Sequence, residues 1–250
     1  MKYYLIAGEA SGDLHGSNLM KGILKADPGA RFRFWGGDKM AAVGGAENLA
    51  MHYEKASFMG FTEVLKNLRT IFGQIEQCKR DVAAYAPDVL VLIDYAGFNL
   101  RLARFGRERG IPTYYYIAPK VWAWKESRVK KIRRWVDRLF VIFPFEVEYF
   151  RRRGIEAIYE GNPLMDAIDA RRAALGSKEE FRAVHGLDGR PVVACLAGSR
   201  RSEIGYNLPF MVELSGRFPQ YQFVVAGVPW LDRSVYEPLI AGSPVRYVCD

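Results

Sequence analysis

Short apolar runs alternate along the chain with longer stretches whose apolar residues recur every three or four positions. Five of the runs predict strands, at Tyr3–Ala7, Arg31–Trp35, Val89–Asp94, Thr113–Ile117 and Leu139–Phe143. Several are apolar without strict alternation, which is typical of parallel strands covered on both faces. The longer stretches predict helices over Leu14–Ala26, Phe61–Tyr85, Leu100–Arg109 and Ser127–Val136. This alternation favours an α/β fold with a doubly wound sheet.

The pattern changes after Gly161-Asn162-Pro163. Two charged helices are predicted first, followed by a second strand–helix–strand pattern; the helices are Asp169–Ala174, Ser177–Val184 and Ile204–Phe218, and the strands Pro191–Ala197, Tyr221–Ala226 and Val245–Cys249. A doubly wound domain usually has five or six strands, and this second pattern has about three. We therefore expect a complete Rossmann-like domain over residues 1–165 and a partial one over residues 166–250.

Composition narrows the class of protein. The 250 residues are half hydrophobic, which excludes a disordered chain, and no apolar run approaches the roughly 18–20 residues that span a bilayer. Tyr3–Ala7 is too short for the apolar part of a signal peptide, so we expect the protein to stay in the cytoplasm. Three scattered cysteines and three histidines without ligand spacing argue against disulfides and metal sites. We expect no metal and no cofactor.

The formal net charge of +8 favours an anionic partner. A nucleotide, a nucleic acid or a membrane surface would each fit, and so would a basic surface without function. Nucleic acid is the least favoured, because the basic residues come without a recognised binding module.

The first candidate motif is Gly8–Gly16, which follows the first strand and opens the first helix. Backbone N–H groups and the helix dipole can hold a ligand in this setting. The glycine spacing is not that of a dinucleotide fingerprint, and Glu9 and Asp13 would repel a phosphate. Sugar hydroxyls or a catalytic carboxylate suit this loop better. The structural alternative is a helix cap by Ser11 or Asp13.

The second motif is Val91–Asn99. Asp94 ends an apolar strand, at the edge where ligands bind in open α/β sheets. A partly desolvated carboxylate there can have a raised pKa and act as a general base. Its structural alternative is to cap the following helix.

The third motif, Tyr115–Lys125, combines aromatic and basic residues and is followed by a basic helix. Such residues can stack on bases, cover a sugar or rest at a membrane interface, and a solvated helix face also explains the cations.

The fourth motif, Gly198–Ile204, joins a strand to a helix in the second domain. An arginine at a helix N-terminus suits a nucleotide diphosphate, although a structural turn with surface arginines is also consistent.

One predicted helix has a bulky apolar stripe with cations beside it. The stripe consists of Phe61, Val64, Leu65, Leu68, Ile71, Phe72 and Ile75. A helix that faces the core explains this pattern, and so does a helix that lies on a membrane.

Seven short motifs occur here in the order that lipid-A-disaccharide synthases share. They are AGEASGD at Ala7–Asp13, Met59-Gly60, IDYAGFN at Ile93–Asn99, VWAW at Val121–Trp124, PFE at Pro144–Glu146, GNPL at Gly161–Leu164 and GSR at Gly198–Arg200. Each is weak alone, but the ordered set is specific. The chain resembles the lipid-A-disaccharide synthase family, glycosyltransferases of the two-domain GT-B fold, over essentially its whole length.

The resemblance implies a reaction. UDP-2,3-diacylglucosamine would donate its sugar to the 6′-hydroxyl of 2,3-diacylglucosamine 1-phosphate (lipid X), giving UDP and the β(1→6) lipid A disaccharide 1-phosphate. It implies an acceptor and membrane side for residues 1–165 and a nucleotide-sugar site for residues 166–250. The other partners implied are the inner-membrane surface and, if the C-terminal domain is complete, a second copy of the chain.

The resemblance also implies roles for individual residues. Asp94 would be the base and Glu9 a second catalytic carboxylate. Arg200 would offset the charge of the leaving diphosphate. Substrate or nucleotide contacts are implied for Ser11, Gly12, Asn99, Trp122, Gly198, Ser199 and Arg200. The membrane would contact Phe61, Val64, Leu65, Leu68, Ile71 and Phe72.

Some positions depart from the family pattern. Tyr95, Ala96 and Gly97 stand where many members have Ala-Pro-Asp, which leaves Asp94 as the only carboxylate of that motif. Asn162 replaces a common histidine, and Ala197 replaces a proline. The family's C-terminal nucleotide-site motif is absent, so we expect little turnover from these residues alone. The alternatives are a non-catalytic lipid- or membrane-binding fragment and a UDP-sugar 2-epimerase of the same fold.

Overall fold

The computed structural model describes residues 1–56 and 68–249. These form two compact units, Met1–Ala170 and Arg171–Asp250, here called unit 1 and unit 2. The sequence predicts a boundary between residues 165 and 166. Helix α9 (Pro163–Ala174) contains the boundary in both cases.

Unit 1 is built on a seven-stranded parallel sheet in the order β3-β2-β1-β4-β5-β6-β7. Its strands are β1 (Lys2–Ala7), β2 (Arg31–Gly36), β3 (Leu49–His52), β4 (Val89–Ile93), β5 (Thr113–Tyr116), β6 (Arg138–Val141) and β7 (Ala157–Tyr159). Its other helices are α1 (Ala10–Ala26), α2 (Asp38–Gly44), η1 (Ala46–Asn48), α3 (Tyr53–Ala56), α5 (Leu68–Tyr85), α6 (Ala96–Glu108), α7 (Arg128–Trp135) and α8 (Pro144–Arg151).

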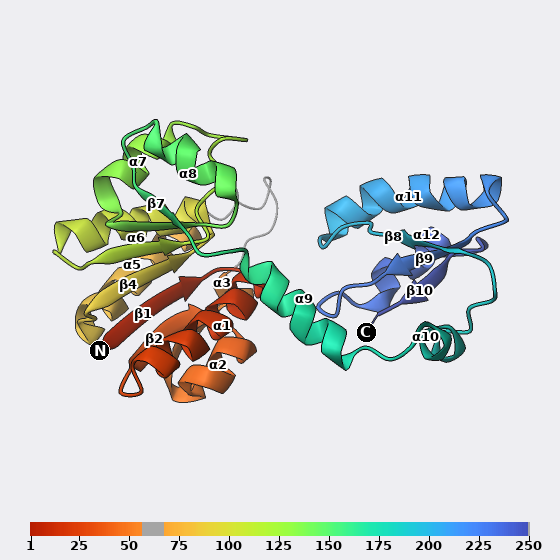
Figure 1. Cartoon of the computed structure of the whole chain (residues 1–250), viewed down its shortest axis with the longest axis horizontal. Helices are drawn as coiled ribbons and strands as arrows, with labels where there is room; N and C mark the ends of the chain where they lie inside the picture. Colours follow the sequence, from red (N-terminus) through yellow and green to blue (C-terminus); the bar gives the residue numbers. More distant parts are fainter. Residues whose placement is uncertain (57–67, 250) are drawn as a thin grey trace. The chain divides into compact units, whose positions relative to one another are not determined.

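The two faces of this sheet bury alternate residues of the same strands. In β1, Tyr4 and Ile6 pack into one core cluster, together with residues of α5 and α6. Leu5 and Ala7 pack into the other, with Met20 of α1 and Met40 of α2. Helices therefore cover both faces (Figure 1), which explains why the central strands are apolar without alternation. The predicted α/β class with a doubly wound sheet is confirmed.

Unit 2 has a three-stranded parallel sheet in the order β10-β9-β8. The elements are α10 (Lys178–Val184), β8 (Val192–Cys195), α11 (Arg201–Arg217), β9 (Gln222–Ala226), η2 (Arg233–Val235), α12 (Glu237–Ile240) and β10 (Arg246–Val248). Its core joins the strands to α11, through Ile204 and Leu208 on the helix and Phe223 and Val225 on β9.

The strand predictions hold, with ends that differ by at most two residues. Helices α1, at Ala10, and α6, at Ala96, begin four residues earlier than predicted, and α9, at Pro163, begins six residues earlier. The first turn of α1 contains small residues without apolar periodicity. The short elements α2, β3, α8 and β7 were not predicted. Residues 61–67 of the predicted helix Phe61–Tyr85 lie outside the described residues.

Candidate functional site

The strand order of unit 1 reverses between β1 and β4, and two of the candidate motifs follow these strands. The strands pair with Ala7 opposite Ile93, so the segments that begin at Gly8 and Asp94 emerge side by side. Gly8 packs beneath the ring of Tyr95, where an added Cβ would lie 2.3 Å from a ring carbon. Both motifs therefore belong to one site, at the switch point where open α/β sheets bind ligands.

The backbone at Asp94 takes an unusual path that neighbouring side chains hold in place. Asp94 and Tyr95 both have positive φ angles, 44° and 45°, a region that bulky residues rarely occupy. The Asp94 carbonyl accepts hydrogen bonds from the Tyr115 hydroxyl (2.6 Å) and from Nδ2 of Asn99 (2.8 Å). Asn99 also donates to the carbonyl of Ile93 and is fully buried. Asn99 thus supports the turn from behind, which differs from the predicted contact with substrate.

The Asp94 carboxylate is accessible to solvent, yet enough protein surrounds it to perturb its ionisation. Desolvation by this surrounding protein raises the pKa of Asp94 above its ordinary value. Lys120, the main-chain N–H of Tyr95, His15 and Arg128 act in the opposite direction, in that order of importance. The carboxylate therefore holds a proton more strongly than a free aspartate, as a general base requires.

His15 lies near this carboxylate, although the spacing of the histidines predicts neither a metal site nor a histidine-based triad. Burial lowers the pKa of His15, and the negative charge of Asp94 only partly offsets this. Nδ1 of His15 is buried and has no hydrogen-bond partner among the described residues. The lowered pKa keeps this imidazole neutral at pH 7 beside the candidate base.

The carboxylate of Asp13 turns away from this site to cap a different helix. It accepts hydrogen bonds from the main-chain N–H groups of Gly37 (2.7 Å), Lys39 (3.0 Å) and Met40 (3.0 Å), at the start of α2. The predicted alternative, a cap on the first helix by Ser11 or Asp13, is wrong, because α1 has Glu9 at its N-cap and no side-chain cap.

The other residues of this motif differ in exposure. Glu9 is half-buried, with an extended backbone, and its charge helps to raise the pKa of Tyr95, second to burial. Ser11 is exposed in the first turn of α1, whereas Gly12 is buried and packs close to Ala7. Glu9 and Ser11 can therefore reach a ligand at this edge, while Gly12 permits the helix to approach the strand.

Trp122 is anchored by a buried carboxylate. Its Nε1 donates to Oε1 of Glu146 (2.9 Å), whose Oε2 accepts the N–H groups of Ile142 and Phe143. Glu146 is fully buried, so the V-W-A-W and P-F-E motifs are joined through it. The Trp122 ring is partly exposed and meets the ring of Phe145 edge-on at 5.1 Å. This fixed aromatic surface can contact a sugar or an acyl chain.

In unit 2, the Gly198-Ser199-Arg200 loop lies between β8 and α11 and already binds a carboxylate. Oε2 of Glu203 accepts the N–H groups of Ser199 (2.9 Å) and Arg200 (3.2 Å). Oε1 lies 3.4 Å from Nη1 of Arg200. Gly198 has a φ of +123°, and an added Cβ would lie 2.5 Å from Cβ of Glu203. The loop therefore has the donors that an anion needs, and a side chain of the same helix occupies them.

The apolar stripe of the predicted membrane helix is only partly described. Phe61, Val64 and Leu65 lie outside the described residues. Leu68 is the first residue of α5, Ile71 packs against the core, and Phe72 is 54% exposed. Ile75 is buried, so the described part of the helix faces the core at Ile71 and Ile75 and solvent at Phe72.

Within residues 1–56 and 68–249, no three His, Cys, Asp or Glu side chains lie together as metal ligands would. In the same residues, no helix combines the length and apolar character needed to cross a bilayer.

Comparison with known proteins decides the family. A family model described as lipid-A-disaccharide synthetase matches residues 3–237. The chain belongs to this family. The lipid-A-disaccharide synthases of Geobacter metallireducens and Geobacter sulfurreducens are 40% and 41% identical to it, over 98% and 96% of this chain. The chain spans 63% and 62% of the length of these two synthases.

Solved structures of low sequence identity share the fold of this family member. A UDP-GlcNAc 2-epimerase from Neisseria meningitidis, bound to UDP-GlcNAc, has a TM-score of 0.68 at 12% identity and covers 100% of this chain and 72% of its own. The Methanocaldococcus jannaschii enzyme, in complex with UDP-GlcNAc and UDP, has a TM-score of 0.64 at 14% identity, with coverages of 99% and 73%. At such identities the likeness shows the GT-B type of fold alone.

Proposed function

We propose that this chain serves the reaction of its family, the joining of two acylated glucosamines in lipid A biosynthesis. The donor is UDP-2,3-diacylglucosamine, and the acceptor is 2,3-diacylglucosamine 1-phosphate. The acceptor's hydroxyl oxygen bonds to the anomeric carbon of the donor while the bond from that carbon to the diphosphate breaks. UDP leaves with the electron pair, and the proton of the hydroxyl passes to a base.

The main support for this proposal is the position of Asp94 and the side chains that surround it. Its carboxylate lies at the switch point of the sheet, on a left-handed turn that Tyr115 and Asn99 hold from behind. Its raised pKa suits proton abstraction from a sugar hydroxyl, a contribution of about 10²–10⁴-fold to rate. Asp94 is therefore the base, and the proton of the acceptor's hydroxyl passes to its carboxylate. Glu9 and Ser11 bind hydroxyl groups of the sugar.

The Gly198-Ser199-Arg200 loop of unit 2 binds the diphosphate of the donor. The fixed positive charge of Arg200 offsets the charge that develops on departing UDP. A phosphate at the amides of Ser199 and Arg200 replaces the carboxylate of Glu203, which binds there in this structure. The Neisseria meningitidis epimerase of the same fold is bound to UDP-GlcNAc, which supports a UDP-sugar as the donor.

Both substrates carry acyl chains, so the chain works at the inner-membrane surface as a peripheral protein. Of the residues expected to contact the membrane, Phe72 supports this best, because its ring is exposed beside Arg101. Trp124 is also exposed, with Lys125 against its ring at 4.2 Å. Aromatic rings beside cations are typical of residues at a membrane interface. The homodimer expected for the family stays a prediction.

A transfer assay tests the proposed function. Because the chain spans 62% of its Geobacter sulfurreducens relative, the assay uses the chain itself and a chimaera that continues with the remaining part of that relative. We expect little turnover from the chain alone. From the chimaera we expect UDP and disaccharide 1-phosphate in equal amounts, with a loss of about 100-fold or more in its Asp94→Asn variant. Asp38→Asn, at a fully accessible carboxylate on α2, is the matched control. Transfer by Asp94→Asn at the parent rate would remove the base assignment.

The same two proteins, the chain and the chimaera, also test the two alternative functions. A UDP-sugar 2-epimerase would invert C2 of UDP-GlcNAc without an acceptor, and the likeness to epimerases concerns the fold alone. A non-catalytic lipid-binding protein would bind both acylated sugars and release no UDP in either form of the protein.

A further inference from the structure

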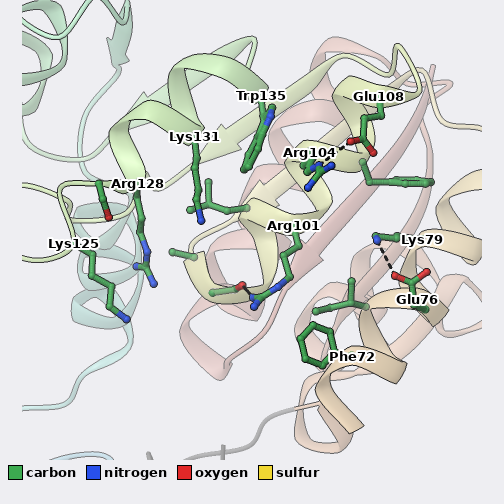
Figure 2. Close-up of a pocket in the computed structure, with 16 residues that line it drawn as sticks. Phe72, Glu76, Lys79, Arg101, Arg104, Glu108, Lys125, Arg128, Lys131 and Trp135 are labelled. Atoms are coloured by element: carbon green, nitrogen blue, oxygen red, sulfur yellow. Dashed lines mark hydrogen bonds and ion pairs between the residues drawn. The ribbon is translucent and has the colours of Figure 1, made fainter. Parts of the chain in front are cut away.

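A cavity of about 790 Å³ lies between α5, α6 and α7 in unit 1 (Figure 2), and no ligand is assigned to it by the proposed function. Its apolar lining includes Ile75, Leu100 and Phe105, each at most 9% exposed. The exposed ring of Phe72 also lines it. The volume is within the range of small-molecule sites.

The polar lining of this cavity is strongly basic. It contains two carboxylates, Glu76 and Glu108, and six cations, Lys79, Arg101, Arg104, Lys125, Arg128 and Lys131. The carboxylates are already used: Glu76 pairs with Lys79 and Glu108 with Arg104, each at 2.7 Å. No described carboxylate lies within ion-pair distance of the other four cations. The cavity therefore holds an excess of positive charge, as a site for an anion does.

The unpaired cations come from different elements and converge. Figure 2 shows the side chains of Arg101 on α6 and of Arg128 and Lys131 on α7 directed into the same space. The guanidinium of Arg101 donates to the carbonyl of Gly97 and lies 5.7 Å from the centre of the Phe72 ring. Arg128 is half-buried, which fixes its guanidinium more firmly than a surface arginine. Two arginine forks and a lysine match the oxygens of a phosphate group.

The cavity adjoins the candidate base. Gly97 and Ala96 line it, and they belong to the same turn as Asp94. Arg128 is close enough to lower the pKa of Asp94, so its charge acts on the cavity and on the base together. A sugar whose hydroxyl meets Asp94 can therefore place an anionic substituent among these cations.

We propose that this basic cavity binds the phosphomonoester of the acylated acceptor sugar. The assignment rests on the proposed function, which supplies an acceptor with a phosphate on the ring and acyl chains beside it. Arg101, Arg128 and Lys131 bind the phosphate oxygens. Phe72 and the apolar lining contact the first carbons of an acyl chain.

A binding experiment on the full chain tests the assignment. The probes are 2,3-diacylglucosamine 1-phosphate with short acyl chains, kept below its micelle concentration, and the same sugar without phosphate. We expect the parent chain to bind the phosphorylated probe about tenfold more tightly or better, by calorimetry. Arg128→Gln with Lys131→Gln should reduce that preference to about twofold or less.

The control variant removes the same amount of charge from the same helix. Lys130 and Arg134 are exposed on α7 and do not line the cavity, so Lys130→Gln with Arg134→Gln removes the same charge from another face. We expect the phosphate preference to survive in this control. Equal circular dichroism spectra establish that both variants fold.

Two results overturn the cavity assignment. The first is a parent chain that binds both probes equally, and the second is a preference that survives in Arg128→Gln with Lys131→Gln. If that variant keeps the probe preference and loses binding to phosphatidylglycerol vesicles, the cavity is assigned to a phospholipid headgroup instead. Phosphate preference without sugar transfer would refute the proposed reaction and support the cavity as a phosphosugar site.

Discussion

Replacing Asp13 with alanine should destabilise unit 1, because its carboxylate caps α2 from a different helix. The carboxylate accepts buried hydrogen bonds from the main-chain N–H groups of Gly37 and Met40. Its hydrogen bond from the N–H of Lys39 is partly buried. An unsatisfied buried donor costs about 1–3 kcal/mol, so two cost about 2–6 kcal/mol. In a chain of this size each kcal/mol lowers Tm by about 2–4 °C, so we expect a decrease of at least about 4 °C.

Thermal unfolding followed by circular dichroism measures the effect, and hydrogen exchange over residues 37–44 locates it. Asp13→Asn should cost less than Asp13→Ala, because the amide oxygen can still accept the N–H groups of Gly37 and Met40. Asp38→Ala is the control, since that carboxylate belongs to the same helix but is 99% exposed. Unchanged Tm and unchanged hydrogen exchange in Asp13→Ala would refute the capping role. An equal decrease in Tm in Asp38→Ala would refute it as well.

Three further predictions concern ionisation, nucleotide binding and the membrane. Burial raises the pKa of Asp94, so the folded state favours the protonated form and stability falls as pH rises above its ordinary value of 3.8. Asp94→Asn should therefore raise Tm at pH 7 and leave it unchanged at pH 3, and an equal effect at both would contradict this. Glu203→Gln should bind UDP several-fold more tightly by calorimetry, because it weakens the competitor for the amides of Ser199 and Arg200; weaker binding would show that Glu203 supports the site. Leu68→Ser with Phe72→Ser should reduce co-sedimentation with anionic vesicles, and unchanged co-sedimentation would rule out docking through this helix.

The strands and the position of Asp94 could be predicted because a strand that is buried on both faces is a run of consecutive apolar residues in the sequence. A run of apolar residues from Val89 to Ile93 identifies a central strand, and the first carboxylate after it must lie at the edge of the sheet. The start of α1 could not be predicted in this way, since its alanine, serine and glycine show no apolar periodicity.

The partners of polar side chains could not be predicted, because they depend on contacts between distant segments. Asp13 meets the start of α2 only after both helices pack on one face of the sheet. Asn99 is a polar residue in a candidate motif, yet its amide meets carbonyls at the ends of strands and never reaches the surface. Glu203 belongs to its predicted motif, but only the structure shows that it binds the loop's own amides.

The proposed function depends most on Asp94, which removes the proton from the acceptor's hydroxyl during sugar transfer. The rate of disaccharide 1-phosphate formation by the chimaera with the Geobacter sulfurreducens remainder, compared with its Asp94→Asn variant at saturating donor and acceptor, tests this role. We expect a rate lower by about 100-fold or more in the variant, with the affinity for the acceptor retained. Equal rates in the two proteins would show that Asp94 is not the base.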